Sequence, residues 1–326
     1  MKKKVIVANR LEQEALDELK KHADVSCFYN IISTENEEFV KKLKEAEGII
    51  GLGLNVDKQL LDLAPNLKIV SNVSVGYNNL DVEELTKRNI MATNTPDILT
   101  DTVADTMFGL LLATARRIPE LDQYVKERKW KGDLTAEFYG VDVHHKTLGI
   151  IGMGRIGQAI AHRAHHGFHM DILYHSRTKK QEVEEKYNAT YKNLENLLAE
   201  SDYVLLITPL TKETRGMIGA REFSLMKETA IFINGSRGQT IVEKDLISAL
   251  RSNEIAAAGL DVFEVEPIQP DNPLLDMPNV VTLPHIGSST YETELAMSKL
   301  ACKNLLAGLN GNKPPTLINE KVWKNK

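Results

Sequence analysis

A glycine pattern lies between a predicted strand and a predicted helix in the middle of this chain, and few folds accommodate it. Residues 147–151 read as a buried strand, and residues 158–166 continue with helical character. Gly152, Gly154 and Gly157 lie between them in a GxGxxG pattern. These glycines would allow a tight turn, a close approach of the backbone to a pyrophosphate, and close packing of the helix on the strand. In this strand-to-helix context, the pattern predicts that a dinucleotide pyrophosphate binds at the helix N-terminus.

The residues after the next strand, 171–174, bear on which dinucleotide binds. A chain specific for NAD commonly places an acidic residue there, about twenty residues past the glycines, to bind the ribose hydroxyls. This chain has Ser176, Arg177 and Thr178 instead. A carboxylate would repel a 2′-phosphate, whereas Arg177 can bind one in a bidentate manner beside two hydroxyls. We therefore expect NADP to be preferred and NAD to be possible, the alternative being that Arg177 is only a solvated charge.

Polar and charged residues follow three later strands, which we expect at residues 230–233, 256–260 and 280–283. In an open parallel sheet, ligands bind beyond the carboxyl ends of the strands. Charged or titratable side chains from these three segments should therefore converge at one edge. They are Arg237, Asp261, Glu266 and His285.

An arginine, a carboxylate and a histidine form a coherent set for reducing a keto acid. Arg237 can pair with the substrate carboxylate and polarise its carbonyl. His285 can supply a proton as hydride arrives, and Glu266 would stabilise and orient the protonated imidazole. Any one of these residues alone is more often structural. Together with a dinucleotide motif, they predict an oxidoreductase.

The rest of the chain indicates an α/β protein of two domains with doubly wound parallel sheets, a Rossmann cofactor domain among them. At 326 residues it exceeds the usual size of one domain. Short β-rich runs alternate with helical segments from the N-terminus, as βαβ units do. Residues 101–117 are predicted to form a helix, either an inter-domain connector or an ordinary core helix. A last helix, capped by Ser288 or Ser289, runs to about residue 306. The expected N-terminal strands are residues 5–8, 49–51 and 67–70, and the helices are 12–21, 37–45 and 57–63.

Composition and charge argue against several other classes. The net charge of −5 gives no reason to expect a nucleic-acid or membrane partner. No secretory signal or membrane-length apolar stretch is visible, so a cytoplasmic protein is expected. Cys27 and Cys302 are interpreted as small hydrophobes rather than a disulfide. The histidines between residues 162 and 169 lack partners at ligand spacing, so we predict a polar helix face and no metal.

The chain resembles the D-isomer-specific 2-hydroxyacid dehydrogenase family over nearly its whole length. The matching motifs are GMGRIG at 152–157, NGSRG at 234–238, GLDVFEVEP at 259–267 and PHIGS at 284–288. The resemblance implies that Arg237 binds and polarises the substrate, that Glu266 supports His285, and that His285 is the acid/base. It also implies that backbone amides of Val75 and Gly76 hold the substrate carboxylate. The further cofactor contacts that it implies are Thr106, Arg155, Ile156, Thr208, Pro209, Ser236 and Asp261.

Within the family, residues 139–148 and the glycine motif look most like members that reduce glyoxylate, hydroxypyruvate and 2-ketogluconate with NADPH. The resemblance implies a discontinuous, flavodoxin-like substrate domain, residues 1–98 and 288–326. The Rossmann cofactor domain, residues 99–287, is inserted in it. It also implies a homodimer, and the aromatic residues of the segment 127–139 fit an interface. Two alternatives are an NAD-dependent dehydrogenase of the D-lactate or phosphoglycerate type and a dinucleotide-sensing corepressor without catalysis.

Overall fold

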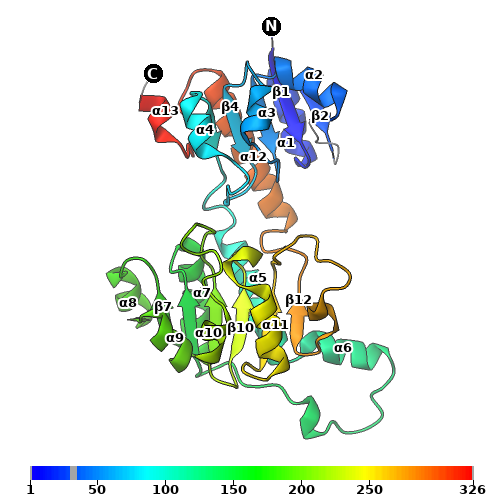
Figure 1. Cartoon of the computed structure of the whole chain (residues 1–326), viewed down its shortest axis with the longest axis vertical. Helices are drawn as coiled ribbons and strands as arrows, with labels where there is room; N and C mark the ends of the chain where they lie inside the picture. Colours follow the sequence, from blue (N-terminus) through cyan, green and yellow to red (C-terminus); the bar gives the residue numbers. More distant parts are fainter. Residues whose placement is uncertain (1, 30–34, 325–326) are drawn as a thin grey trace. The chain divides into compact units, whose positions relative to one another are not determined.

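A computed structural model of the chain describes residues 2–29 and 35–324. It divides into two compact units, one comprising Met1–Leu99 with Ser289–Lys326 and the other Thr100–Ser288. Each unit is an α/β structure built on one parallel sheet, which confirms the predicted fold class (Figure 1). In the described part of the chain, no helix has the length and apolar character needed to cross a membrane.

The first unit contains a five-stranded sheet in the order β2-β1-β3-β4-β5, which is the flavodoxin-like order. Helices α2, α3 and α4 bury leucines and a phenylalanine against one face of the sheet. Helices α1 and α12 contact each other, and α12 packs against β3, β4 and β5. The elements are β1 Lys3–Ala8, α1 Gln13–His22, β2 Ala23–Phe28, α2 Glu37–Glu45, β3 Gly48–Gly51, α3 Lys58–Asp62, β4 Ile69–Asn72, α4 Val82–Lys87, β5 Met91–Thr93, α12 Tyr291–Leu309 and α13 Glu320–Lys324.

The second unit contains a seven-stranded sheet in the order β12-β11-β10-β9-β6-β7-β8. The strand order reverses between β6 and β9, the switch point where such sheets bind ligands. The elements are α5 Thr100–Ala115, α6 Ile118–Lys126, β6 Thr147–Ile151, α7 Arg155–Phe168, β7 Asp171–His175, α8 Gln181–Tyr187, β8 Thr190–Tyr191, α9 Leu194–Glu200, β9 Tyr203–Leu206, α10 Ala220–Ser224, β10 Ile231–Asn234, α11 Glu243–Arg251, β11 Ala257–Leu260 and β12 Val280–Thr282, with short 3₁₀ turns at Ala136–Phe138, Gly238–Thr240 and Pro273–Asp276.

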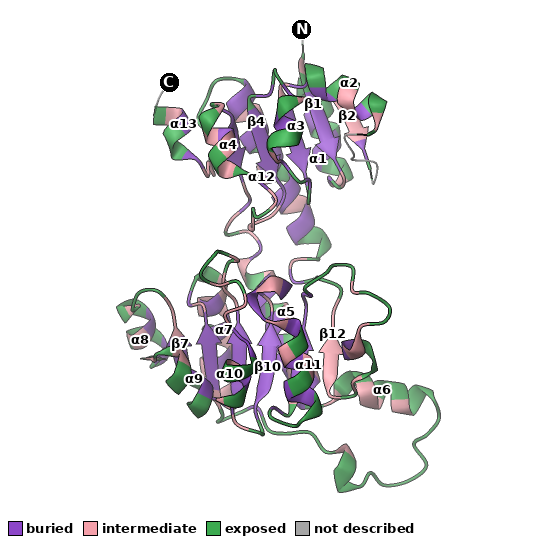
Figure 2. Cartoon of the chain, in the orientation of Figure 1, coloured by how far each residue is buried: buried purple, intermediate pink, exposed green. Residues whose placement is uncertain are grey.

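The central strands of this second sheet are apolar because both of their faces are covered. Helices α5 and α7 contact each other on one face, and α9, α10 and α11 follow one another on the other face (Figure 1). Strands β9 and β10 are buried along their whole length, whereas the edge strand β12 is only half-buried (Figure 2). Helix α5 packs against α7, β10 and β11, so of the two interpretations of this helix the structure supports the core helix.

Several of the predicted elements were wrong in their bounds or missing. The cap of α12 is Thr290, whose hydroxyl accepts a hydrogen bond from the N–H of Thr293 at 3.3 Å, and not Ser288 or Ser289. Strand β4 begins at Ile69, two residues later than expected, because the polar ends of apolar runs give no sharp boundary. Strand β2 was missed altogether, since its exposed edge position leaves Asp24 and Ser26 among its residues and breaks up the apolar pattern.

Candidate active site

The glycine turn after β6 has the geometry that its sequence requires. Gly152 has a φ of +109°, and a Cβ there would lie 2.5 Å from the carbonyl oxygen of Ile207. A Cβ on Gly157 would lie 2.2 Å from the carbonyl oxygen of Gly152. A Cβ on Gly154 would meet no atom within 4 Å, so this side of the turn is open. Only glycine fits at the two crowded positions, and the open one permits close approach of a ligand.

Helix α7 starts directly after this turn and can bind an anion. Gly154 is its N-cap and supplies no side-chain acceptor to the first turn. Arg155 and Ile156 are the first two residues of this 14-residue helix. A helix start without a side-chain cap attracts phosphate through its N–H groups and its dipole. The turn and the first turn of α7 therefore fit the pyrophosphate of a dinucleotide.

The residues after β7 form a small polar turn without a carboxylate. The hydroxyl of Ser176 donates a hydrogen bond to the carbonyl oxygen of Thr178 at 2.7 Å, which brings these two residues together. Arg177 between them is exposed. A guanidinium and two hydroxyls are thus present at the position where an acidic residue would bind ribose hydroxyls.

His285 and Glu266 form a hydrogen-bonded pair beyond the ends of β12 and β11. Nδ1 of His285 lies 2.7 Å from Oε2 of Glu266, and the other carboxylate oxygen accepts a hydrogen bond from the N–H of Phe263 at 3.0 Å. The side chain of His285 is 43% exposed, so its second ring nitrogen can reach a ligand. Burial raises the pKa of Glu266, but the bonds from His285 and Phe263 and the charges of His285 and Arg237 outweigh burial and lower it.

Arg237, the third residue of the predicted triad, follows β10. Its side chain donates a hydrogen bond to the carbonyl oxygen of Ser236 at 2.7 Å, and the residue is half-buried. Burial lowers the pKa of Arg237, and the nearby carboxylates of Glu266 and Asp261 oppose that effect. The charges of Arg237 and His285 both act to lower the pKa of Glu266, so the three side chains lie within electrostatic range of one another.

Asp261 directly follows β11 and holds the loop of His285. It is only 2% exposed, and its two carboxylate oxygens accept hydrogen bonds from the N–H groups of Ile286 and Gly287 at 2.7 and 2.9 Å. Burial raises the pKa of Asp261, while these N–H groups and His285 act to lower it. The hydroxyl of Thr106 donates to the carbonyl oxygen of Gly287 at 3.1 Å. Asp261 and Thr106, both predicted as cofactor contacts, thus hold the two residues that follow His285, whose φ is +54°.

The loops after β9 and β10 are joined through Thr208 and Ser236. The hydroxyl of Ser236 donates to the carbonyl oxygen of Thr208, and the two hydroxyls lie 3.5 Å apart. The carbonyl oxygen of Pro209 accepts a hydrogen bond from the hydroxyl of Thr214 at 2.6 Å. These predicted cofactor residues therefore lie together at the carboxyl edge of the second sheet. Val75 and Gly76 lie in the first unit, half-buried in the loop after β4.

Glu243 is a residue of the site that sequence reasoning missed. Its carboxylate accepts hydrogen bonds from the N–H of Glu264 at 2.9 Å and from the side-chain amide of Asn272 at 2.7 Å. It is 9% exposed and so holds, from the start of α11, the loop that carries Glu266. In the sequence, a glutamate in the first turn of a helix is unremarkable, because it complements the helix dipole.

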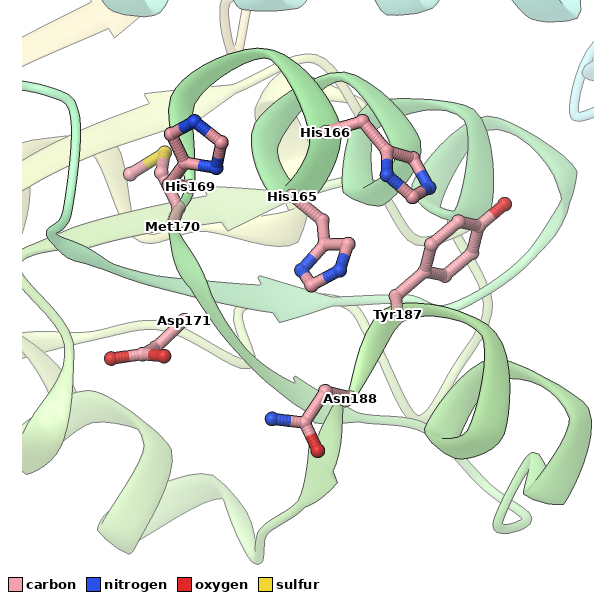
Figure 3. Close-up of a pocket in the computed structure, with 7 residues that line it drawn as sticks. All are labelled: His165, His166, His169, Met170, Asp171, Tyr187 and Asn188. Carbon is pink, nitrogen blue, oxygen red and sulfur yellow. The ribbon is translucent and has the colours of Figure 1, made fainter.

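The histidines near the end of α7 line a pocket of about 220 Å³ outside this site (Figure 3). The rings of His165 and His166 lie 4.8 Å apart, and those of His162 and His166 lie 4.7 Å apart. Among residues 2–29 and 35–324, no group of three or more histidine, cysteine or acidic side chains is arranged to hold a metal. Contacts with the ring of Tyr187 show a packed aromatic and polar face.

A comparison with known families identifies the class of protein. The model of the D-isomer specific 2-hydroxyacid dehydrogenase NAD-binding domain matches residues 108–287, which hold the glycine turn and the Arg237–Glu266–His285 site. The chain belongs to this family, as its motifs predicted. It is therefore an NAD(P)-dependent oxidoreductase.

The names of similar proteins give a narrower activity than the family name does. A glyoxylate/hydroxypyruvate reductase B of Escherichia fergusonii is 48% identical over 324 residues, 99% of this chain and 100% of that protein. Among solved structures, a Thermus thermophilus protein is 38% identical with a TM-score of 0.90, covering 96% of this chain and 99% of that one. An NADPH-dependent glyoxylate/hydroxypyruvate reductase of Sinorhizobium meliloti, in complex with NADP and malonate, is 33% identical with a TM-score of 0.87, covering 98% of both chains.

Proposed function

We propose that this chain reduces small 2-keto acids to D-2-hydroxy acids with NADPH, and that glyoxylate, hydroxypyruvate and 2-ketogluconate are among its substrates. The observation that carries the proposal is the 2.7 Å pair of His285 and Glu266 beside Arg237, in the same unit as the glycine turn. The full-length similarity to glyoxylate/hydroxypyruvate reductases supports the first two substrates. The inclusion of 2-ketogluconate rests on the motif resemblance alone.

In the proposed reaction, the bound nicotinamide supplies a hydride to the keto carbon. Arg237 pairs with the substrate carboxylate and polarises the carbonyl, which favours the negative charge that develops on the oxygen. His285 donates its proton to that oxygen, so the carbonyl becomes a hydroxyl. Glu266 stabilises the protonated imidazole before the transfer and keeps the ring oriented through Nδ1. The amides of Val75 and Gly76 are proposed to bind the substrate carboxylate.

The proposed cofactor preference rests on the turn after β7. Arg177 and the hydroxyls of Ser176 and Thr178 suit a 2′-phosphate, and no acidic residue is present among residues 176–180 to repel it. The Sinorhizobium meliloti relative is described as NADPH-dependent. The cofactor contacts at Thr106, Arg155, Ile156, Thr208, Pro209, Ser236 and Asp261 are part of the same proposal.

The proposed assembly is a homodimer through the segment that follows α5. Helix α6 has no buried residue, and Trp130, Tyr139 and Val141 are 61%, 65% and 50% exposed. Apolar side chains that are exposed together on one segment indicate an interface. A cytoplasmic location, expected from the sequence, stays a proposal as well.

Initial rates with a panel of 2-keto acids test the proposed function. Glyoxylate, hydroxypyruvate, pyruvate and 2-ketogluconate would each be assayed with NADPH and with NADH. We expect the highest kcat/KM for glyoxylate or hydroxypyruvate with NADPH. A maximum for pyruvate with NADH would instead support the D-lactate alternative. Cofactor binding without turnover of any substrate would support the sensor alternative.

A further inference from the structure

We infer that Asn72 and Asn94 are positioning residues, which turn the backbone amides of the loop after β4 outward so that they can bind a carboxylate. This inference deepens the proposed function and rests on it. The motif resemblance implies that these amides bind the substrate, but it does not say which side chains orient them.

Three consecutive carbonyl groups of this loop are held by the protein. The carbonyl oxygen of Ser74 accepts a hydrogen bond from the N–H of Thr95 at 2.9 Å. That of Val75 accepts one from the side-chain amide of Asn94 at 2.9 Å. That of Gly76 accepts one from the side-chain amide of Asn72, also at 2.9 Å. Each carbonyl of the turn is therefore directed toward the body of the first unit.

The planarity of the peptide group converts these bonds into an orientation of the amides. In a trans peptide, the C=O of one residue and the N–H of the next point in opposite directions. Holding the carbonyls of Ser74, Val75 and Gly76 therefore directs the N–H groups of Val75, Gly76 and Tyr77 away from the unit. Within the described residues, no hydrogen bond from these three N–H groups to a protein acceptor is found. Successive amides that point outward form a concavity suited to an anion.

The two asparagines are themselves fixed. Asn72 is 3% exposed, and its side-chain oxygen accepts a hydrogen bond from the amide of Asn79 at 3.2 Å. The backbone carbonyl of Asn94 accepts bonds from the hydroxyl of Thr316 at 2.6 Å and from the amide of Asn304 at 3.3 Å. The loop is thus pre-organised before any ligand arrives, which lowers the entropy cost of binding.

The matching substrate class is an anion with two oxygens, such as the carboxylate of a 2-keto acid. Amide bonds to an ionised acceptor are stronger than bonds to a neutral one. The loop should consequently favour an acid over its neutral ester. Loss of one such bond corresponds to roughly a ten- to hundred-fold loss in kcat/KM.

The test replaces Asn94 by leucine, which has a similar shape but no side-chain N–H to donate. Wild type and Asn94→Leu would be assayed with NADPH on glyoxylate and on methyl glyoxylate. We expect the KM for glyoxylate to rise roughly ten-fold or more, with kcat and NADPH affinity nearly unchanged. The preference for the acid over the ester should fall by the same factor, because only the acid uses the amides.

Asn66→Leu is the matched control, since the amide of Asn66 also donates to a carbonyl of the first unit, that of Lys44, but lies elsewhere. If Asn94→Leu is insoluble, Asn94→Ala removes the same donor. Equal losses on acid and ester, or an unchanged acid preference, would overturn the positioning role alone. A wild type that shows no preference for the acid, or does not reduce glyoxylate, would overturn the proposed function and this inference with it.

Discussion

At the scale of single residues, Glu266 shows how the site keeps a carboxylate ionised although it is partly buried. Burial alone would raise its pKa, but hydrogen bonds from His285 and from the N–H of Phe263 reverse the effect. A carboxyl whose pKa is lower in the folded state stabilises that state at every pH above its unfolded pKa, about 4.3. This stabilisation is lost as the pH falls through the lower, folded pKa.

The first prediction follows from the lowered pKa of Glu266. The difference in unfolding free energy between wild type and Glu266→Gln should shrink as the pH falls below about 4.3, because Glu266 then takes up a proton. Urea unfolding of both proteins at several pH values measures it. Asp276→Gln, which alters a carboxyl elsewhere in the unit, is the control. A difference that stays the same down to the most acidic pH would contradict the account.

The second prediction concerns Arg177. A charge-assisted hydrogen bond to a 2′-phosphate contributes roughly 1.5–3 kcal/mol, or a ten- to hundred-fold preference for NADPH. Because Arg177 is exposed and screened by salt, the lower end is expected. Ser176→Asp combined with Arg177→Ala should reverse the ratio of kcat/KM for NADPH and NADH. Arg251→Ala, an exposed arginine at the end of α11, should leave the ratio unchanged. Equal efficiencies in the wild type would show that Arg177 is merely solvated.

At the scale of elements, the loops that carry Arg237 and Glu266 meet at one glycine. A Cβ on Gly238 would lie 1.8 Å from the carbonyl carbon of Phe263 and 2.3 Å from the nitrogen of Glu264. Both contacts are with backbone, which cannot rotate away as a flexible side chain can. The two loops therefore depend on glycine at this position.

The third prediction is that Gly238→Ala lowers the unfolding free energy by about 1–3 kcal/mol and reduces activity, because the two loops must separate. Gly167→Ala is the matched control. A Cβ there meets nothing within 4 Å, and alanine favours the helix by about 1 kcal/mol. Urea unfolding of the two variants should thus give opposite signs. An unchanged unfolding free energy in Gly238→Ala would mean that the two loops do not need their close contact.

The elements also show what the sequence could predict. The glycine turn and the strand ends that carry Arg237, Glu266 and His285 follow from local patterns, and the structure places these features in one unit. The supporting bonds could not be foreseen, because they join distant segments. Examples are Glu243 with the loop of Glu266, 21 residues away at Glu264, and Thr106 with Gly287, 181 residues away. No spacing rule encodes such pairs.

At the scale of the whole molecule, the oligomeric state is the fourth prediction. Light scattering at micromolar concentration should give about twice the monomer mass of 36.5 kDa. Trp130→Glu combined with Tyr139→Glu should shift the mass toward the monomer, because charges replace exposed aromatic rings. Tyr291→Glu, at a ring that is 67% exposed outside this segment, is the control. A wild type of monomer mass would rule out the dimer.

The second unit combines a turn that fits a dinucleotide with the proposed proton donor, His285. Removing the imidazole of His285 should therefore leave NADPH binding intact and slow the reduction of the keto acid. His144→Ala, which removes an exposed histidine of the same unit, controls for the loss of an imidazole.

The most direct measurement is the rate of NADPH oxidation by glyoxylate for wild type and His285→Ala, with NADPH affinity determined by fluorescence for both. We expect the affinity to be retained while kcat falls by about a hundred- to ten-thousand-fold, the usual contribution of general acid catalysis. A near-normal kcat in His285→Ala would contradict it, because the proton would then come from another group.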